Sequence, residues 1–519
     1  MAPARHDALR LPTGILFLAV VLGGCRRATE PGLVIANVTV YDGSGAPGFP
    51  ASVRIVGDRI EAVGEVRSRE TDWFVDGTGL ALAPGFIDTH SHADRGIFEE
   101  RGALAAVSQG ITTVVVGQDG GSPYPLAEYF GRLDSTPAAV NVASLAGHGT
   151  LRELVMGEDT HRTATAAEVD SMGALLRQEL GAGALGLSTG LEYEPGIYSS
   201  YEEVVSLARL AADSGGRYVS HIRSEDRAFW EAVDEIIRIG RDARLPVHIS
   251  HLKLAMRSLW GLGDSLIAVL DRARASGVEL TADVYPYTAW QSSLTVLFPE
   301  RDYSDREAAR FALREVAQPD DLVISRFDPE SSYVGRTLEE IASRRRSDPA
   351  TTLFALIREA EAMETRTGRS AESVIGISMS EQDVERLLAW PWANVCTDGE
   401  LAGRHPRGFG AFPRVLGRHV RERSRLTMED AIHRMTGLPA LTMGFSDRGV
   451  IAPGQYADLV LFDPATVLDQ ATMEEPRKPA VGIRSVWVNG QAVYEQGGTT
   501  GAFPGRVLRR TDRRSIVRP

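Results

Sequence analysis

The sequence predicts an α/β protein, and three observations support this fold class. The chain has 519 residues, more than one ordinary domain but enough for a (β/α)8 TIM-like barrel of roughly 250 or more residues with added segments. Between residues 84 and 446, short apolar runs are followed by amphipathic helical segments. Strand-like stretches flank this region on both sides. A doubly wound sheet would alternate in the same way, so periodicity alone does not select the barrel.

The first 25 residues have the pattern of a secretory signal. Arg5 and Arg10 precede an apolar run, Ile15 to Leu22, which leads through two glycines to Cys25. This ending resembles the bacterial lipobox, whose cysteine is lipidated; an ordinary signal peptide with an incidental cysteine is the alternative. The run is shorter than the about 20 residues of a spanning helix. We expect an exported protein, periplasmic or a membrane-anchored lipoprotein, that contacts the membrane only through a lipid anchor on Cys25.

Composition indicates a folded enzyme and argues against a nucleic-acid partner. Hydrophobic residues make up 43% and charged residues 24% of the chain, as in globular proteins. The formal net charge is −13, whereas binding to nucleic acid requires a basic surface. The two cysteines, Cys25 and Cys396, provide no disulfide framework once the first is lipidated. Stability must then come from the core and from bound metal.

Both ends of the chain predict a small β domain. Residues 33–40 and 52–56 read as strands, and so do residues 457–462 and 483–488, which precede an Asn489-Gly490 hairpin turn. We expect these pieces to pair into one β-sandwich. Its two parts are residues 31–83 and 447–500. The arginine-rich residues 501–519 are expected to form a surface tail.

The barrel region, residues 84–446, contains one interruption. Apolar runs predict strands at residues 112–116, 184–187, 217–220, 246–249 and 278–282. Residues from about 297 to 346 replace this rhythm with a charged, helix-leaning segment. We interpret this segment as an insertion beside the site, where it could form a lid.

The most informative local sequence is an apolar strand that ends in two histidines, His90 and His92. Side chains two apart on a strand point to the same side. Two imidazoles at the carboxyl end of a strand can ligate one divalent metal, and barrel active sites lie at that end. Taken alone, the pair is also compatible with a structural role.

Further candidate ligands fall at the ends of other predicted strands. His221 and His251 each end an apolar run, and Asp398 follows another. With His90 and His92 they provide imidazoles and a carboxylate near strand ends. This is a suitable ligand set for one or two zinc ions.

A series of blocks between about residues 34 and 495 resembles the D-aminoacylase (N-acyl-D-amino-acid deacylase) branch of the amidohydrolase superfamily. The His-x-His motif alone would indicate only the superfamily, whereas the order and spacing of the blocks are typical of the branch. Besides the segments around His221 and His251, the blocks are residues 84–92, 109–117, 147–152, 186–191, 283–289, 405–407 and 412–417.

The resemblance implies a distorted (β/α)8 barrel with a β-sandwich built from both chain ends. It also implies an enzyme that uses zinc-activated water to cleave N-acyl-D-amino acids into a carboxylate and a free D-amino acid. By the same similarity, His221 and His251 hold the tighter metal, and His90, His92 and Asp398 surround a second, weaker site. Asp398 would be the catalytic proton acceptor and donor.

The chain departs from the family at the position of the metal-bridging cysteine, where Asp119 stands. A carboxylate is a harder ligand than a thiolate and would change metal preference or the pKa of bound water. We predict that Asp119 is a ligand; a turn residue next to two glycines is the alternative. Cys396 is not a substitute, and we expect it to be a buried, inert thiol.

Substrate-binding candidates lie close to these ligands. The resemblance suggests that Lys253 and Tyr285 pair with the substrate α-carboxylate, and Tyr193 and Arg407 are similar candidates. A solvated lysine and packing roles for the tyrosines are the alternatives. Glu192 lies where the family lines its side-chain pocket and could favour a cationic substrate, although an exposed loop carboxylate is commoner.

Other functions stay open at this point. Asp119 in place of cysteine is compatible with a different hydrolase on the same scaffold, such as a dipeptidase, a cyclic-imide hydrolase or a lactonase. His148 is expected to support the site without binding metal. An exported binding lipoprotein without catalysis would be expected to lack a ligand, whereas the histidines and Asp398 are all present.

Overall fold

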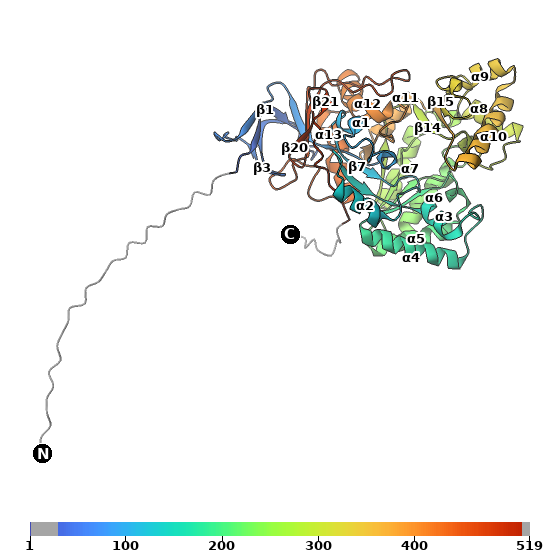
Figure 1. Ribbon diagram of the computed structural model, residues 1–519, viewed down its shortest axis with the longest axis horizontal. Helices are drawn as coiled ribbons and strands as arrows, with labels where there is room; N and C mark the ends of the chain where they lie inside the picture. The colour runs from blue at the N-terminus through green and yellow to red at the C-terminus, as the bar shows by residue number, and fades with distance from the viewer. Residues whose placement is uncertain (2–29, 511–519) are drawn as a thin grey trace.

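The computed structural model describes residue 1 and residues 30–510. The predicted signal segment with Cys25 therefore lies outside the described residues. Figure 1 shows a β-rich part at one side, a central α/β part, and a helical unit at the opposite side. Within residues 30–510, no helix is both long and apolar enough to cross a membrane.

The two ends of the chain meet in one nine-stranded sheet. Strands β5 and β18 join them, pairing antiparallel with Leu82 opposite Leu461. Asn489 and Gly490 turn with φ of 47° and 79° between β19 and β20, the conformation that favours these residue types in hairpins. The strands are β1 (Leu33–Val40), β2 (Phe49–Val56), β3 (Arg59–Gly64), β4 (Trp73–Asp76), β5 (Ala81–Pro84), β18 (Leu459–Phe462), β19 (Ile483–Val488), β20 (Gln491–Glu495) and β21 (Gly498–Thr499).

The central part consists of parallel strands that pair in chain order. One sheet runs β6-β7-β8 and another runs from β9 to β13 and then β17, while β8 continues into β9 across Leu145. The strands are β6 (Phe86–Asp88), β7 (Ile111–Val116), β8 (Asn141–Ser144), β9 (Ala146–Gly147), β10 (Gly186–Gly190), β11 (Arg217–His221), β12 (Val247–Ile249), β13 (Leu280–Val284) and β17 (Ala393–Val395).

The two outermost of these strands, β6 and β17, are linked just beyond their carboxyl ends. The His92 N–H donates to the Gly399 carbonyl (3.0 Å), and the Asp398 N–H donates to the His90 carbonyl (2.9 Å). A (β/α)8 barrel requires each strand to lie beside the next in chain order and the last strand to lie beside the first. Here the link between β6 and β17 consists of loop contacts rather than a full ladder.

The helices around the strands are amphipathic, as the pattern predicts. Helix α6 buries Phe229, Val233, Ile236 and Ile239, because residues at this spacing share one face of a helix. The helices are α1 (Leu104–Val107), α2 (Leu126–Ser135), α3 (His148–Met156), α4 (Ala166–Ala182), α5 (Tyr201–Asp213), α6 (Phe229–Ala243), α7 (Gly263–Ala275), α11 (Glu381–Leu388), α12 (Arg407–Arg414), α13 (Met428–Met435) and α14 (Gly437–Met443).

The inserted unit is longer than the predicted 297–346. It contains an antiparallel sheet, β14-β16-β15, and the helices at the right of Figure 1. The prediction missed the four-residue β14, which is too short to carry a clear period, and stopped before the helix at residues 349–367 and the strand that follows it. Its elements are β14 (Ala289–Ser292), α8 (Arg306–Glu315), β15 (Leu322–Phe327), α9 (Leu338–Arg345), α10 (Pro349–Thr367) and β16 (Glu372–Ile377).

The predicted surface tail needs a correction. Within residues 501–510 the backbone lies along β8: the Val142 N–H donates to the Arg506 carbonyl (2.9 Å) and the Leu508 N–H to the Val142 carbonyl (2.8 Å). Apolar Val507 and Leu508 pack against core residues, and this burial holds the segment in place despite its arginines. Residues 511–519 lie outside the described part.

Candidate metal centre

The predicted ligands come together at the carboxyl ends of the parallel strands. His90 and His92 follow β6, Asp119 follows β7, and Asp398 follows β17. His221 is the last residue of β11 and His251 lies just beyond β12. Their ligand atoms form two groups in which all atoms lie within 4.8 Å of one another: His90, His92, Asp119 and Asp398; and Asp119, His221 and His251.

Asp119 belongs to both groups. Its Oδ2 atom lies 3.4 Å from His90 Nε2 and 3.5 Å from His92 Nε2. Its Oδ1 atom lies 3.4 Å from His251 Nε2. One carboxylate therefore presents an oxygen to each group, which is the arrangement that a bridging ligand needs.

The remaining ligands complete each group. Asp398 Oδ1 lies 3.2 Å from His92 Nε2 and 3.6 Å from His90 Nε2. In the other group, His221 Nδ1 lies 3.1 Å from His251 Nε2. Both groups combine imidazole nitrogen with carboxylate oxygen, the donors that zinc takes in catalytic sites.

His90 provides a separate indication that a cation fits. The side chain is fully buried, and neither of its ring nitrogens makes a hydrogen bond within residues 30–510. A buried polar atom without a partner is costly, and such atoms are rare in folded proteins. A divalent metal bound between His90, His92, Asp119 and Asp398 would give one of these two nitrogens, Nε2, a partner.

Backbone conformation is unusual at three ligand positions. Asp119, His251 and Asp398 have positive φ of 55°, 35° and 47°. Residues other than glycine seldom adopt this region, and when they do they often lie at functional sites. The surrounding structure holds His251 there, since its N–H donates to the buried carboxylate of Asp283.

The two site carboxylates are ionised at neutral pH. Burial opposes the charge of Asp398, but Arg407, whose NH1 lies 2.8 Å from Asp398 Oδ2, and the neighbouring histidines hold its pKa well below the usual range. Burial likewise opposes ionisation of Asp119, and the surrounding histidines, His90 and His251 above all, outweigh it and lower its pKa. Both side chains are therefore in the form that binds metal.

Two glutamates support the histidines from behind. Glu192 is only 4% exposed, and its Oε2 lies 2.8 Å from His221 Nε2. The interpretation of Glu192 as an exposed loop carboxylate was therefore wrong: its side chain turns inward to His221, and Arg301 of the inserted unit donates to its backbone carbonyl. Glu225, which sequence reasoning missed, lies 3.2 Å from His251 Nδ1 and pairs with Lys253 at 2.5 Å.

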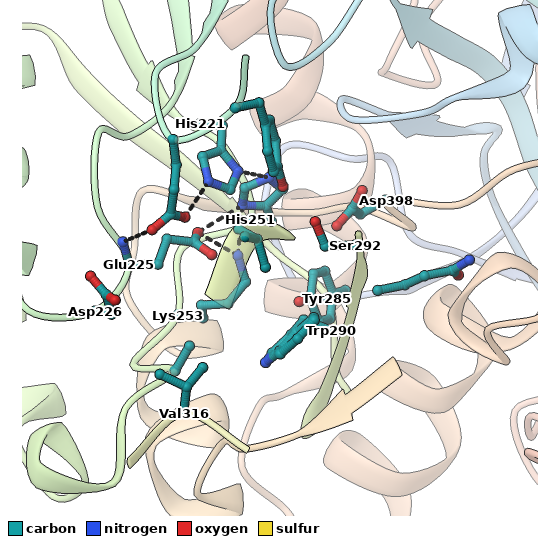
Figure 2. A pocket seen from close by; sticks show the side chains of 15 residues that line it. His221, Glu225, Asp226, His251, Lys253, Tyr285, Trp290, Ser292, Val316 and Asp398 are labelled. Carbon is teal, nitrogen blue, oxygen red and sulfur yellow. Dashed lines mark hydrogen bonds and ion pairs between the residues drawn. The ribbon is translucent and has the colours of Figure 1, made fainter. Parts of the chain in front are cut away.

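Three of the four substrate-binding candidates, Lys253, Tyr285 and Tyr193, line a pocket next to the metal ligands, and Figure 2 labels the first two. Lys253 is 5% exposed, so it is not a solvated strand-end lysine. Its Nζ lies 5.9 Å from the ring centre of Tyr285, and the Arg407 guanidinium stacks on the same ring at 4.7 Å. Tyr193 packs on His221, with 4.2 Å between ring centres. Tyr193, Lys253 and Tyr285 therefore line one pocket beside the ligands, and Arg407 lies against the Tyr285 ring.

The inserted unit closes this pocket. Trp290, Ser292, Val296 and Val316 come from it and line the side that faces Lys253, as Figure 2 shows for Trp290 and Val316. On the other side of the ligands, His92, Asp119 and Arg407 also border a wider polar groove of about 840 Å³. The pocket and the groove share Tyr193 and Asp398 in their linings, so the two spaces adjoin at the ligands.

Two further residues singled out in the sequence lie away from the ligands. His148 is buried with Nε2 2.8 Å from the Glu203 carboxylate, which also pairs with Arg152. Its role is structural support. Cys396 is buried, its Sγ lies 3.3 Å from Asp283 Oδ1, and burial raises the pKa of the thiol well above its usual range. Cys396 is therefore buried, as expected, and its environment disfavours the reactive thiolate.

Comparison with known proteins gives consistent matches. Residues 74–393 and 302–494 match the Amidohydrolase family (Amidohydro_3). The chain is 39% identical to N-acyl-D-glutamate deacylase of Alcaligenes xylosoxydans xylosoxydans, covering 92% of this chain and 96% of the relative. It is 36% identical to D-aminoacylase of the same organism, covering 92% and 98%.

Solved structures agree with these relatives. A crystal structure of D-aminoacylase matches with a TM-score of 0.82 at 37% identity, covering 92% of this chain and 99% of that one. N-acyl-D-glutamate deacylase from Bordetella bronchiseptica, complexed with zinc and a phosphonate mimic of the tetrahedral intermediate, matches with a TM-score of 0.83 at 37% identity, covering 93% and 100%.

Proposed function

The chain belongs to the amidohydrolase family, and from this premise we propose that it hydrolyses N-acyl-D-amino acids to a carboxylate and a free D-amino acid. Membership confirms the resemblance found in the sequence, and the similarity to D-aminoacylase structures confirms the α/β fold class. The observation that carries the proposal is the placement of the ligand groups against a pocket lined by Lys253 and Tyr285, with Arg407 in the adjoining groove.

The proposed ligands are His90, His92, Asp119, His221, His251 and Asp398, holding one or two zinc ions. When bound, zinc lowers the pKa of a bound water towards about 7 and polarises the scissile carbonyl. The chain's own side chains move the proton. Asp398 is ionised and accepts the proton of the attacking water. It then delivers this proton to the nitrogen as the carbon–nitrogen bond breaks.

Binding and orientation fall to the pocket. Lys253 is a buried cation whose only carboxylate partner among the described residues is Glu225; a substrate α-carboxylate fits between it and the free hydroxyl of Tyr285. Trp290, Val296 and Val316 then exclude water around the amino-acid side chain. With the substrate α-carboxylate held at Lys253 and Tyr285, the acyl group extends towards the open groove.

The test is a substrate panel on purified protein that lacks residues 1–25. N-acetyl-D- and N-acetyl-L-amino acids are compared by amine release, together with dipeptides, a cyclic imide and a lactone. We expect release from the D-acyl compounds that stops after chelation and returns with zinc. Chelator-sensitive turnover of an imide, a lactone or a dipeptide alone would support the metal centre but contradict the proposed substrate class.

We also propose that the chain is exported and anchored through a lipid on Cys25. Support comes from the apolar run before Leu22-Gly23-Gly24-Cys25 and from the position of the first strand, which begins at Leu33. The test is expression of the full chain in a Gram-negative host with labelled palmitate. We expect label in the membrane fraction that Cys25→Ser abolishes; unlabelled full-length protein would contradict the anchor.

A further inference from the structure

Glu192 is a buried charged side chain that the proposed reaction does not use. It follows β10 in the loop before Tyr193. Its Oε2 lies 2.8 Å from His221 Nε2, and its Oε1 accepts the N–H of Glu225 at 3.0 Å. The backbone carbonyl of Glu192 accepts from Arg301 at 2.6 Å. Both carboxylate oxygens therefore have a protein partner.

The opposite nitrogen of the His221 ring faces the ligand cluster. His221 Nδ1 lies 3.1 Å from His251 Nε2 and belongs to the group formed with Asp119. A ring nitrogen binds metal only through its lone pair, so the proton of a neutral His221 has to reside on Nε2. A carboxylate at hydrogen-bonding distance from Nε2 stabilises that tautomer.

We infer that Glu192 is a positioning residue for the metal centre: it accepts the Nε2–H of His221 and keeps Nδ1 free for the metal. This inference rests on the proposed role of His221 as a ligand. Tyr193 packs on the His221 ring with 4.2 Å between ring centres. This packing and the hydrogen bond to Glu192 together fix the plane of the ring. Through its second oxygen Glu192 holds the backbone of Glu225, whose side chain contacts His251 and Lys253.

The test is zinc affinity of metal-free protein, measured by competition with a chromophoric chelator. Glu192→Gln keeps the shape but leaves one acceptor for two N–H donors. We expect zinc affinity to fall about 10- to 100-fold, the usual cost of losing such a contact. Glu194→Gln is the matched control, because Glu194 lies two residues away with its side chain 39% exposed; its zinc affinity should change less than about twofold. Equal affinities in the two variants would overturn the inference.

A double-mutant comparison locates the effect. In a His221→Ala background, Glu192→Gln should cause a much smaller further loss of zinc affinity, because only the indirect contact through Glu225 to His251 remains. A full additional loss in that background would show that Glu192 acts elsewhere and would contradict the inference. Neither experiment needs substrate, so an error in the proposed substrate class would leave both results unaffected.

A second measurement needs no variant at Glu192. In metal-free protein with ¹⁵N-labelled histidine, at a pH at which the ring is neutral, the His221 signals are assigned by comparison with His221→Ala. We expect the Nε2–H tautomer. An Nδ1–H tautomer of His221 would overturn the inference even if Glu192→Gln did not fold.

Discussion

The ends of the parallel strands and the inserted unit contribute different chemistry to one pocket. The strand ends supply buried ionisable groups such as His90, His251 and Asp398, together with the partly buried Asp119, and hold several of them at positive φ. The inserted unit, from β14 to β16, supplies Trp290 and Val316, which line the pocket but belong to neither ligand group. The comparison indicates that bond cleavage belongs to the strand ends and side-chain selection to the insertion. Variants of the ligands at the strand ends should therefore lower kcat, whereas variants in the insertion should change KM for particular substrates.

The largest effect is expected at the strand ends, for Asp398→Asn. The change keeps the size of the side chain but removes the group that moves the proton, so kcat should fall about 10²- to 10⁴-fold. Asp328→Asn, at a half-exposed carboxylate of the insertion, is the control and should leave kcat unchanged. Steady-state kinetics with zinc-saturated protein measure both. Near-normal turnover of Asp398→Asn would remove Asp398 from its catalytic role.

Lys253→Met should act mainly on substrate binding. A hydrogen bond to a charged group contributes about 1.5–3 kcal/mol, so kcat/KM should fall by about 10- to 100-fold, mostly through KM. Lys478→Met is the matched control, because Lys478 lies on the surface, with its side chain 48% exposed. An unchanged KM with reduced zinc content would instead assign Lys253 to support of the metal ligands.

Val316→Phe tests the insertion. The larger ring fills space beside Trp290, so KM should rise about 10-fold for substrates with long side chains and much less for N-acetyl-D-alanine. Zinc affinity should stay as in the unmodified protein, since Val316 is outside both ligand groups. An equal effect on every substrate would contradict a selective role for this region.

The smallest effect concerns stability of the insertion rather than activity. Burial raises the pKa of Glu372 to about 8, above its ordinary value of 4.5. As pH rises from about 4.5 to 8, the folded state keeps a proton that the unfolded chain releases, so this contribution to stability is lost. Glu372→Gln does not titrate. Its unfolding temperature should match that of the unmodified protein at pH 5 and exceed it by about 3 °C or more at pH 8.5.

Glu307→Gln provides the control for this comparison. Glu307 lies in the same inserted unit, with its side chain 80% exposed, so its substitution should shift the unfolding temperature equally at pH 5 and pH 8.5. If Glu372→Gln also gives a shift independent of pH, Glu372 is not the group that titrates.

The ligands at the strand ends could be predicted from the sequence, whereas the loop residues and the bounds of the insertion could not. His90, His92, His221, His251 and Asp398 follow apolar runs, and parallel strands bring their carboxyl ends together, so the convergence of these side chains followed from the strand pattern. The structure places Asp119 among them, which the resemblance had suggested.

Residues outside the periodic hydrophobic pattern of the helices and strands were harder to predict. Glu192 and Glu225 lie in loops, where no hydrophobic pattern indicates direction, and only the folded chain shows that they face His221 and His251. The start of the insertion was missed because the four-residue β14 is too short to carry a clear period. Residues 501–510 were missed because Val507 and Leu508 stand among arginines, which pointed to solvent.

The central claim is that a metal held by these histidines and carboxylates is required to cleave an N-acyl-D-amino acid. The most direct test is amine release from N-acetyl-D-amino acids during stepwise addition of zinc to metal-free protein, with metal content determined by elemental analysis. The account predicts no release without metal, D-selective release as one to two equivalents bind, and loss of both zinc and release in His221→Ala. Full release by metal-free protein, or release from the L-compounds alone, would contradict it.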